Sequence, residues 1–315
     1  MTAIRRAIRA PNKAARRNIS ENAQLWTLAL PAVIQLFVFS YLPIFGVVLA
    51  FKKFNVTKGI MGSAWVGLEN FRFYFTSLDA SRTLRNTLTM NALFIAIGTV
   101  CSIALALALF EAPKRGHVKF FQTVFVLPHL VSWVVVSYIA YTLLQPTSGL
   151  INGMIKRLGG TAIQWYTQPK YWPAILVCFS VWKGVGMSSL YYYGSLMGVD
   201  EEIFEAARLD GAGRLQIAWH VSLPFLVPTI TVLTILSIGG IFRADFGLFY
   251  NVTMNNGMLY PTTDVIDTYI YRALMKVGNI GMSSAVGLFQ SLVGMALVLA
   301  TNAIVRRIDA DRALI

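Results

Sequence analysis

The stretch Glu205-Ala-Ala-Arg-Leu-Asp210-Gly211-Ala-Gly213 lies in a polar, acid-rich island between two long apolar runs. From residue 200 onward, apolar residues recur with helical spacing. This pattern predicts a helix with a charged face and an apolar face, the latter formed by Ile203, Phe204, Ala207 and Leu209. The two glycines predict the end of this short helix and a turn. We expect a helix across the membrane face that presents an apolar ridge and a carboxylate to a soluble partner. The alternative is an amphipathic interfacial helix without a partner.

The island closes with Val221-Ser-Leu223-Pro224, which leads into the second apolar run. Pro224 suits a first helical turn, because the N–H that proline lacks would have no intrahelical partner there. The sequence therefore predicts a loop over residues 200–221 that ends where the next membrane span begins.

The composition predicts a polytopic membrane protein. Apolar residues make up 56% of the 315 residues, charged residues make up 13%, and the mean hydropathy is +0.60. Soluble proteins carry about 25% charged residues. The net charge of +13 does not indicate nucleic-acid binding, because Lys and Arg lie in flanks and loops and form no interleaved basic and aromatic surface. Cys101 and Cys178 lie inside apolar runs, which predicts buried side chains without a disulfide or metal role.

Six apolar runs approach the length of about twenty residues that a bilayer core requires. They predict an all-α fold with spans at about residues 25–51, 87–110, 120–144, 172–194, 224–242 and 282–305. The first run is too long for the core of a signal peptide, and Pro31 and Pro43 predict kinks in it. Residues 55–85 are too polar to span and are expected to pack as a small helix on the external membrane surface.

Basic flanks predict the orientation of the chain. Residues 1–22 form a basic tail with no acidic residue before Glu21, and Arg306 and Arg307 follow the last span. An even number of spans places both termini on one side, and the positive-inside rule makes that side cytoplasmic. The short loop 111–119 and the loop 200–221 lie on the same side. We expect a single transmembrane domain over 23–308, with cytoplasmic tails at 1–22 and 309–315.

The sequence contains no catalytic signature. It has no P-loop, no His or Cys pair at metal-ligand spacing, and no nucleophile beside a base. We expect no catalytic residue, no metal and no cofactor on this chain, so ATP hydrolysis would fall to another subunit.

Charged and aromatic residues inside the spans are candidates for a solute path. A charge at membrane depth costs about 2.5–3.5 kcal/mol on insertion scales and usually faces a cavity or a partner. Lys183 fits this description, whereas Arg243 and Asp245 are equally expected to reach the outer interface. Aromatic rings stack on the faces of sugar rings, and ligand sites combine such walls with a few polar groups. The aromatic candidates are Trp133, Trp182, Tyr191 and Tyr192, with an interfacial belt as the alternative for the tyrosines.

The Glu-Ala-Ala-x-x-Asp-Gly-Ala pattern, followed by Gly and then by Val-x-Leu-Pro, resembles the EAA signature of the permease subunits of binding-protein-dependent ABC importers. The resemblance implies a type I importer permease fold in which the loop forms a coupling helix that sits in a cleft of a cytoplasmic ATPase subunit. The docking residues that it implies are Glu205, Ala206, Ala207, Leu209, Asp210, Gly211, Ala212 and Gly213.

Further motifs resemble the polysaccharide and oligosaccharide subgroup of carbohydrate permeases. They are Tyr41-Leu-Pro43, Trp65-Val-Gly-Leu-Glu-Asn-Phe71, Leu127-Pro-His-Leu-Val-Ser-Trp133, Trp182-Lys-Gly184 and Asp264-Val-Ile-Asp-Thr-Tyr-Ile-Tyr-Arg272. The subgroup implies a bacterial cytoplasmic membrane, a second homologous permease, two ATPase subunits that bind ATP and Mg, and an extracellular solute-binding protein. The resemblance implies that the cargo is an oligosaccharide or a uronate-containing glycan.

Three other hypotheses remain open at this stage. The chain could be the permease of an ABC importer for a different solute, because the EAA signature does not specify cargo. A stand-alone channel or secondary transporter would be expected to show internal repeats or a charged relay within its spans, and the sequence shows neither. A membrane scaffold would recruit a soluble protein through the same loop without moving a solute.

Overall fold

The computed structural model describes residues 13–112 and 115–308. The predicted tail 309–315, the first part of the N-terminal tail and Lys114 lie outside the described residues. The long helices are α1 (Lys13–Leu36), α4 (Leu78–Phe110), α5 (Arg115–Leu130), α6 (Trp133–Leu144), α8 (Trp172–Leu196), α11 (Leu223–Gly239) and α14 (Ile280–Ile308). The shorter helices are α2 (Gly59–Gly62), α3 (Glu69–Phe75), α7 (Leu150–Arg157), α9 (Glu201–Leu209), α10 (Arg214–Ile217), α12 (Tyr260–Thr263) and α13 (Ile266–Met275).

Short 3-10 and π-helical turns connect these elements. They are η1 (Phe37–Tyr41), η2 (Leu42–Phe51), η3 (Trp165–Thr167), η4 (Pro169–Tyr171), η5 (Ala218–Ser222), η6 (Leu248–Val252) and η7 (Gly257–Leu259). Two short antiparallel strands, β1 (Lys52–Lys53) and β2 (Ala64–Trp65), form the sheet of the described residues. The predicted all-α fold is confirmed.

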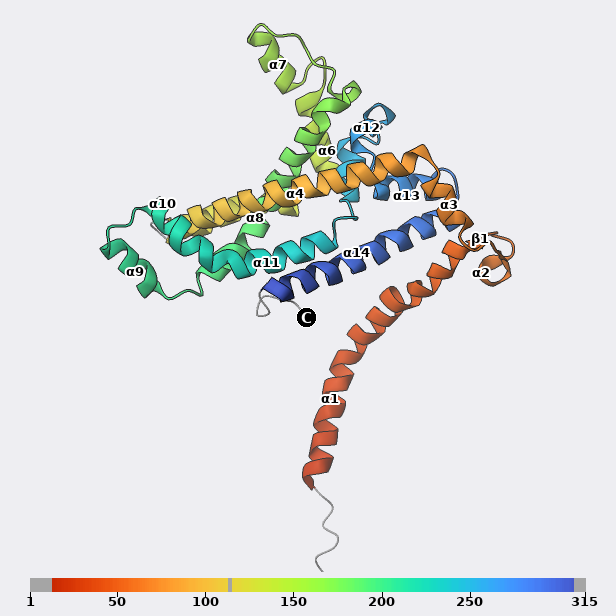
Figure 1. The fold of residues 1–315 in the computed structure, drawn as a ribbon, viewed down its shortest axis with the longest axis horizontal. Helices are drawn as coiled ribbons and strands as arrows, with labels where there is room; N and C mark the ends of the chain where they lie inside the picture. The colour runs from red at the N-terminus through yellow and green to blue at the C-terminus, as the bar shows by residue number, and fades with distance from the viewer. Residues whose placement is uncertain (1–12, 113–114, 309–315) are drawn as a thin grey trace, which may run out of the picture.

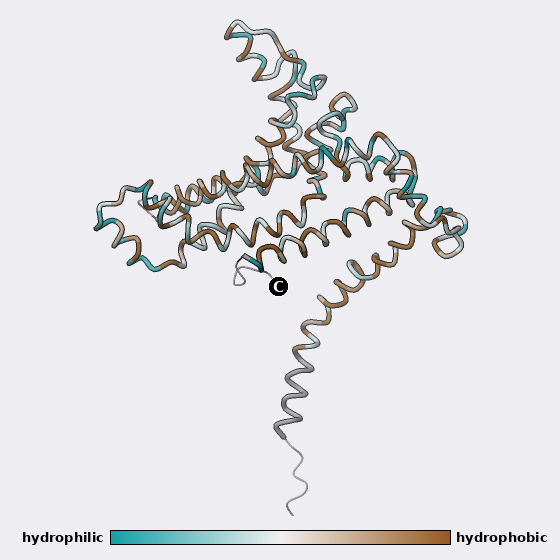
Figure 2. Tube along the Cα trace, in the orientation of Figure 1, coloured by the Kyte–Doolittle hydropathy of each residue, from teal (hydrophilic) through white to brown (hydrophobic). Residues whose placement is uncertain are grey.

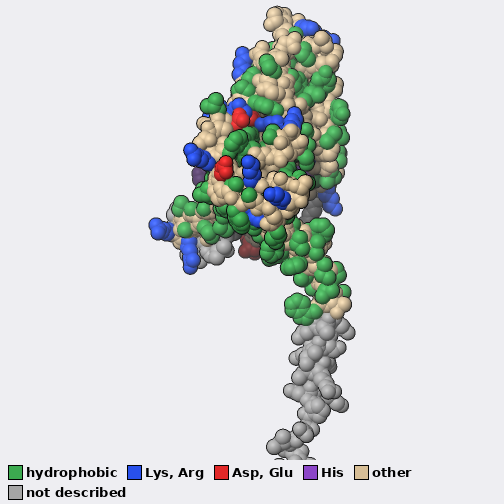
Figure 3. Space-filling view, turned by 90° about the vertical axis from the view of Figure 1, so that its right-hand side faces the viewer, with side chains coloured by type: hydrophobic (Ala, Val, Ile, Leu, Met, Phe, Trp, Pro, Cys, Tyr) green, Lys and Arg blue, Asp and Glu red, His purple; other side chains and the backbone are tan. Residues whose placement is uncertain are grey.

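The long helices α4, α8, α11 and α14 form the body of the molecule (Figure 1). Their apolar residues run along most of their length, whereas polar residues gather at the ends (Figure 2). One end, here called the α9 end, carries α9 and α10, and the opposite end, here called the α13 end, carries α2, α3 and α13 (Figure 1). Most charged side chains visible on the α13 end are Lys or Arg (Figure 3).

Five helical stretches are long and apolar enough to cross a membrane, and the bent pair α5 and α6 makes a sixth if it counts as one span. The predicted span 120–144 is therefore not one straight helix. The two helices meet at an angle of 95°. Pro128 cannot donate a backbone hydrogen bond, and the Ser132 hydroxyl accepts one from the Val135 N–H, so that a new helix begins at the break.

The N-terminal span differs from the others in its packing. No residue of its most apolar window, within Leu25–Phe51, is buried inside the chain. Its last part, η2, packs against α14, while α1 extends away from the body (Figure 1). Pro31 lies inside α1, and the regular α-helix has already ended where Pro43 follows in η2.

Two sequence predictions at helix ends need correction. The predicted external segment 55–85 ends earlier, because α4 begins at Leu78 with Ser77 as its N-cap. Pro224 lies in the first turn of α11, as predicted, but the continuous helical stretch that contains it already starts at Arg214 and runs to Gly239. The π-helical turn η5 lies immediately before Leu223, and its wider hydrogen-bond register removes the clash that proline causes with the preceding turn of a regular helix.

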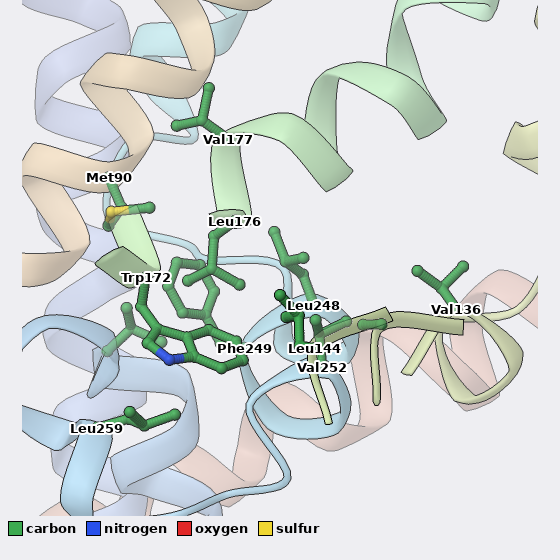
Figure 4. Close-up of a cluster of buried hydrophobic side chains, with 12 residues drawn as sticks. Met90, Val136, Leu144, Trp172, Leu176, Val177, Leu248, Phe249, Val252 and Leu259 are labelled. Atoms are coloured by element: carbon green, nitrogen blue, oxygen red, sulfur yellow. The ribbon is translucent and has the colours of Figure 1, made fainter. Parts of the chain in front are cut away.

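The main core cluster fixes α8 against α6 and η6. Trp172, the first residue of α8, is fully buried, and its indole N–H donates to the carbonyl of Trp165 at 2.8 Å. Figure 4 shows Trp172 and Leu176 of α8 beside Leu248 and Phe249 of η6. Segments that are far apart in sequence are thereby held together next to the break between α5 and α6.

A buried carboxylate joins the start of α4 to α13. Asp264 has a fully buried side chain and forms ion pairs with Arg82 at 2.7 Å and Arg272 at 2.5 Å. Asn86 of α4 donates to the carbonyls of Tyr260, Pro261 and Asp264. These contacts make the α13 end a firmly connected part of the fold.

The two cysteines are not buried as predicted. Cys178 is exposed on α8 and Cys101 is partly exposed on α4. An apolar residue of a membrane helix has no need to face the protein interior, because lipid is an equally apolar environment.

Candidate functional site

Helix α9 is attached to the bundle through one aromatic side chain. Phe204 is 2% exposed and its ring lies 4.9 Å from the ring of Phe110, at the end of α4. Ile217, at the end of α10, is also buried. The helix therefore has a fixed attachment on the side that faces the bundle.

The predicted apolar face of α9 is narrower than expected. Phe204 is buried and Ala207 is partly buried, but Ile203 is 39% exposed and Leu209 is 89% exposed. Leu209 follows Phe204 by five residues, which at 100° per residue turns it about 140° away from the buried side. Leu209 is therefore available for a partner rather than for packing within this chain.

The end of α9 is closed by a Schellman motif. The Ala212 N–H donates to the Ala207 carbonyl at 3.0 Å and the Gly211 N–H donates to the Arg208 carbonyl at 3.1 Å. Gly211 adopts φ +81°, in the left-handed region that favours glycine. Gly213 has φ −71° and caps α10, and its N–H donates to the Gln216 side chain at 2.8 Å. The two glycines of the motif thus have different roles.

The predicted docking residues form an accessible surface. Glu205, Ala206, Leu209, Asp210, Gly211 and Gly213 are exposed, while Ala207 and Ala212 are partly exposed. Beside them lies an open hollow of about 330 Å³, lined by Asp210, Gly211, Ala212 and three residues of the following helical stretch. Within the described part of the chain, neither Glu205 nor Asp210 forms an ion pair. Their carboxylates are therefore available to a partner.

A second group of predicted residues meets at the break between α5 and α6. The Trp133 indole N–H donates to the Asp245 carboxylate at 2.7 Å, and the Lys183 ammonium lies 5.2 Å from the centre of the Trp133 ring. Lys183 also donates to the carbonyl of His129 at 2.7 Å, which compensates a carbonyl freed by the break. These three side chains are here called the Trp133 cluster.

Close approaches fix the position of this cluster. A Cβ on Gly186 would lie 1.9 Å from the Phe125 carbonyl oxygen, and a Cβ on Gly247 would lie 2.2 Å from the Trp133 ring. Gly184, by contrast, has open space around it. Of Gly184 and Gly186, only Gly186 lies at a close approach to another helix.

The remaining candidates for a solute path lie apart from the Trp133 cluster. Arg243 is exposed and donates to Ser291 of α14 at 3.2 Å. Trp182 is 43% exposed, and its ring is nearly perpendicular to that of Phe179. Tyr191 and Tyr192 line a separate hollow of about 440 Å³. The structure thus brings together three of the seven predicted path residues.

Sequence reasoning missed the residues that hold the segment 243–245. Asp267 of α13 accepts hydrogen bonds from the Ala244 N–H at 2.8 Å and from the Gln290 side chain at 3.3 Å. Burial raises the pKa of the Asp267 carboxyl above its ordinary value, although these hydrogen bonds oppose the rise. A polar residue in an otherwise apolar helical pattern, such as Gln290, is the sequence signal that could have indicated this contact.

Comparison with known proteins decides the family. Residues 98–311 match the family described as "Binding-protein-dependent transport system inner membrane component". The chain belongs to this family. It is 36% identical over 287 residues to the polygalacturonan/rhamnogalacturonan transport system permease protein YteP of Bacillus subtilis (strain 168), covering 91% of this chain and 89% of YteP.

Solved structures agree with this assignment. A bacterial ABC transporter involved in the import of the acidic polysaccharide alginate contains a chain that is 32% identical and superposes with a TM-score of 0.84, covering 94% of this chain and 99% of that chain. A second structure, of a bacterial alginate ABC transporter in complex with an alginate pentasaccharide-bound periplasmic protein, gives 32% identity and a TM-score of 0.83, covering 93% and 97%. The chain is a multi-pass membrane permease subunit with the fold of these importers.

Proposed function

We propose that this permease moves an oligosaccharide derived from a polysaccharide, an acidic one among the candidates, into the cell by alternating access. The observation that carries the proposal is the capped and exposed helix α9, which is attached to the bundle through Phe204. Force can pass between a motor subunit and a membrane bundle only through a contact that does not yield, and a short helix with a fixed attachment meets that requirement.

The proposal assigns ATP hydrolysis to two separate ATPase subunits, which bind ATP and Mg. This chain binds no cofactor, pairs with a second homologous permease in the lipid membrane, and receives its cargo from a solute-binding protein. The α9 end and both termini face the cytoplasm, and the α13 end faces the outside. Closure of the ATPase pair moves α9 and converts the helix bundle from the inward-facing to the outward-facing state. ATP hydrolysis returns the bundle to the inward-facing state.

Two observations support a sugar as the cargo. YteP is named for polygalacturonan and rhamnogalacturonan transport, and the two similar structures come from alginate importers. In this chain, the Trp133 cluster combines an aromatic ring, a cation and a carboxylate beside the break in a membrane helix. Such a combination suits a ligand that has both ring faces and hydroxyl groups.

The test uses the complete transporter in proteoliposomes, with Glu205→Ala compared to Glu201→Ala. Both carboxylates are exposed on α9, but only Glu205 lies in the predicted docking surface. We expect Glu205→Ala to lower sugar uptake at least about tenfold, as the loss of one central interface contact does. Uptake by Glu201→Ala should stay close to that of the unsubstituted protein. Normal uptake by Glu205→Ala would contradict the proposal.

A panel of acidic and neutral oligosaccharides, each supplied with the solute-binding protein, tests the cargo. We expect oligosaccharides to stimulate ATP hydrolysis by the reconstituted transporter. Stimulation by another class of solute, with none by any sugar, would overturn the assignment of cargo and leave the assignment as a permease intact.

A further inference from the structure

An open groove of about 650 Å³ lies between α6 and the segment around η6, separate from the Trp133 cluster. Its walls include three tyrosines, Tyr138, Tyr141 and Tyr250, together with Asn251, Asn255 and Lys276. Tyr138 and Tyr141 lie on one face of α6, because they are three residues apart in a helix. Tyr141 follows Trp133 by eight residues, which places it about 12 Å further along α6 at 1.5 Å per residue. The groove therefore extends along α6, from beside the Trp133 cluster toward the C-terminal end of this helix.

Two of the three tyrosine rings, those of Tyr141 and Tyr250, pack against neighbouring rings, and all three tyrosines expose surface. Tyr250 stacks on Phe246 with ring centres 4.9 Å apart, and its ring packs edge-on against Tyr271. The ring of Tyr141 lies 5.9 Å from that of Tyr166, and 38% of Tyr141 remains exposed. Tyr138 is 69% exposed. Rings that are already in place lose little conformational freedom when a flat ligand binds to them.

Two adjacent residues that line the groove have an unusual backbone conformation. Met254 and Asn255 adopt φ of 56° and 45°, a left-handed conformation that is uncommon for residues other than glycine. The Asn255 N–H donates to the Tyr250 carbonyl at 2.9 Å, and its side-chain oxygen accepts from the Tyr260 hydroxyl at 3.1 Å. The surrounding structure thus holds a costly turn that keeps an amide at the groove surface.

The groove carries a positive charge. Lys276 is the single charged residue among those that line it, and no carboxylate joins them. Lys276 is exposed, and it forms no ion pair with any residue that the structure describes. An ammonium without an ion pair, beside tyrosine rings and amides, is complementary to a ligand that carries hydroxyl groups and a carboxylate.

We propose that this groove binds a segment of a uronate-containing oligosaccharide before it reaches the Trp133 cluster. The tyrosine rings stack on the sugar rings, the asparagine amides face sugar hydroxyls, and Lys276 pairs with a uronate carboxylate. The inference rests on the proposed function, because the groove receives cargo only if the chain is a sugar permease with its α13 end outside.

The test measures uptake by the complete transporter in proteoliposomes, with the loaded solute-binding protein outside. The probes are an oligogalacturonate and a neutral oligosaccharide of equal length. Lys276→Gln is compared with Lys156→Gln, which removes an exposed lysine from α7, away from the groove. Tyr138→Ala and Tyr138→Phe separate the ring from its hydroxyl. Sugar binding to the isolated solute-binding protein is unchanged by all four variants and serves as the reference.

We expect Lys276→Gln to raise the concentration of acidic cargo needed for half-maximal uptake about tenfold, as the loss of a charge-assisted contact does, and to leave neutral cargo nearly unaffected. Tyr138→Ala should weaken uptake of both cargoes, and Tyr138→Phe should restore most of it. Lys156→Gln should change neither.

Several outcomes would overturn the inference while leaving the proposed function in place. These are normal acidic uptake by Lys276→Gln, an equal loss for acidic and neutral cargo, and transport of neutral cargo alone by the unsubstituted protein. If the unsubstituted transporter takes up no oligosaccharide at all, the proposed function fails, and the inference fails with it.

Discussion

At the scale of single residues, the ion pairs of Asp264 give the clearest prediction about stability. Its carboxylate is fully buried between Arg82 and Arg272, and the Tyr260 ring lies 4.3 Å from the Arg272 guanidinium carbon. The Arg82 Nε and one Arg272 terminal nitrogen are buried without a hydrogen-bond partner among the described residues. Removal of the carboxylate that serves both guanidinium groups therefore leaves Arg272, whose side chain is 14% exposed, without an ion pair among the described residues and leaves Arg82 paired with Asp79 alone.

We expect Asp264→Ala to destabilise the protein by about 3–5 kcal/mol, the range found when one partner of a buried ion pair is removed. Asp79 also pairs with Arg82, but its side chain is 44% exposed. Asp79→Ala should cost at most about 1 kcal/mol, because exposed ion pairs contribute little. Thermal unfolding of both variants in detergent measures the difference, and equal losses would contradict the assignment.

Asp267 gives a prediction about pH. Its folded-state pKa is raised by burial, so the folded protein holds this proton more tightly than the unfolded chain does. Its contribution to stability is fully present below the ordinary aspartate pKa of about 4 and is lost as the pH rises through the raised value. Asp267→Asn keeps an oxygen acceptor without the charge and should flatten this loss. Tm measured from about pH 4 to about pH 7 checks it, and parallel curves for both proteins would contradict it.

At the scale of helices, existence and length were predictable, whereas bends and contacts were not. The run 172–194 agrees with α8 to within two residues, because a long apolar run has one stable form in a membrane. The break after Leu130 was missed, since the apolar run continues through it and Pro128 is its one clear sequence signal. That break is stabilised by Lys183 of another helix, and a single sequence does not show which helix will supply such a contact.

The packing of α5 on α8 gives a prediction at this scale. Gly186→Ala would place a methyl group 1.9 Å from the Phe125 carbonyl oxygen and force the helices apart, whereas Gly184→Ala meets nothing within 4 Å. We expect Gly186→Ala to lower Tm by several degrees, as a destabilisation of about 1–3 kcal/mol does, and Gly184→Ala to leave it nearly unchanged. Similar Tm values for the two variants would show that the close approach is wrong.

At the scale of the whole molecule, the predicted docking helix and the Trp133 cluster differ in how far the sequence predicted them. The helix predicted from the Glu-Ala-Ala pattern forms at one end of the bundle, and its carboxylates face outward from the chain. The meeting of Trp133, Lys183 and Asp245 was not predictable as a cluster, because it joins residues up to 112 positions apart through helix packing. In the function proposed above, the choice of cargo depends on these contacts, and the coupling to ATP hydrolysis depends on α9.

The most direct test of the account asks where Glu205 lies in the assembled transporter. Cys101 and Cys178 are first replaced by serine, and Glu205→Cys is introduced into the complete complex in cells. We predict that the new thiol crosslinks to an ATPase subunit and reacts with a membrane-impermeant maleimide only after the cytoplasmic face is opened. Labelling of the thiol in intact cells, or the absence of any crosslink to the ATPase, would contradict the central claim.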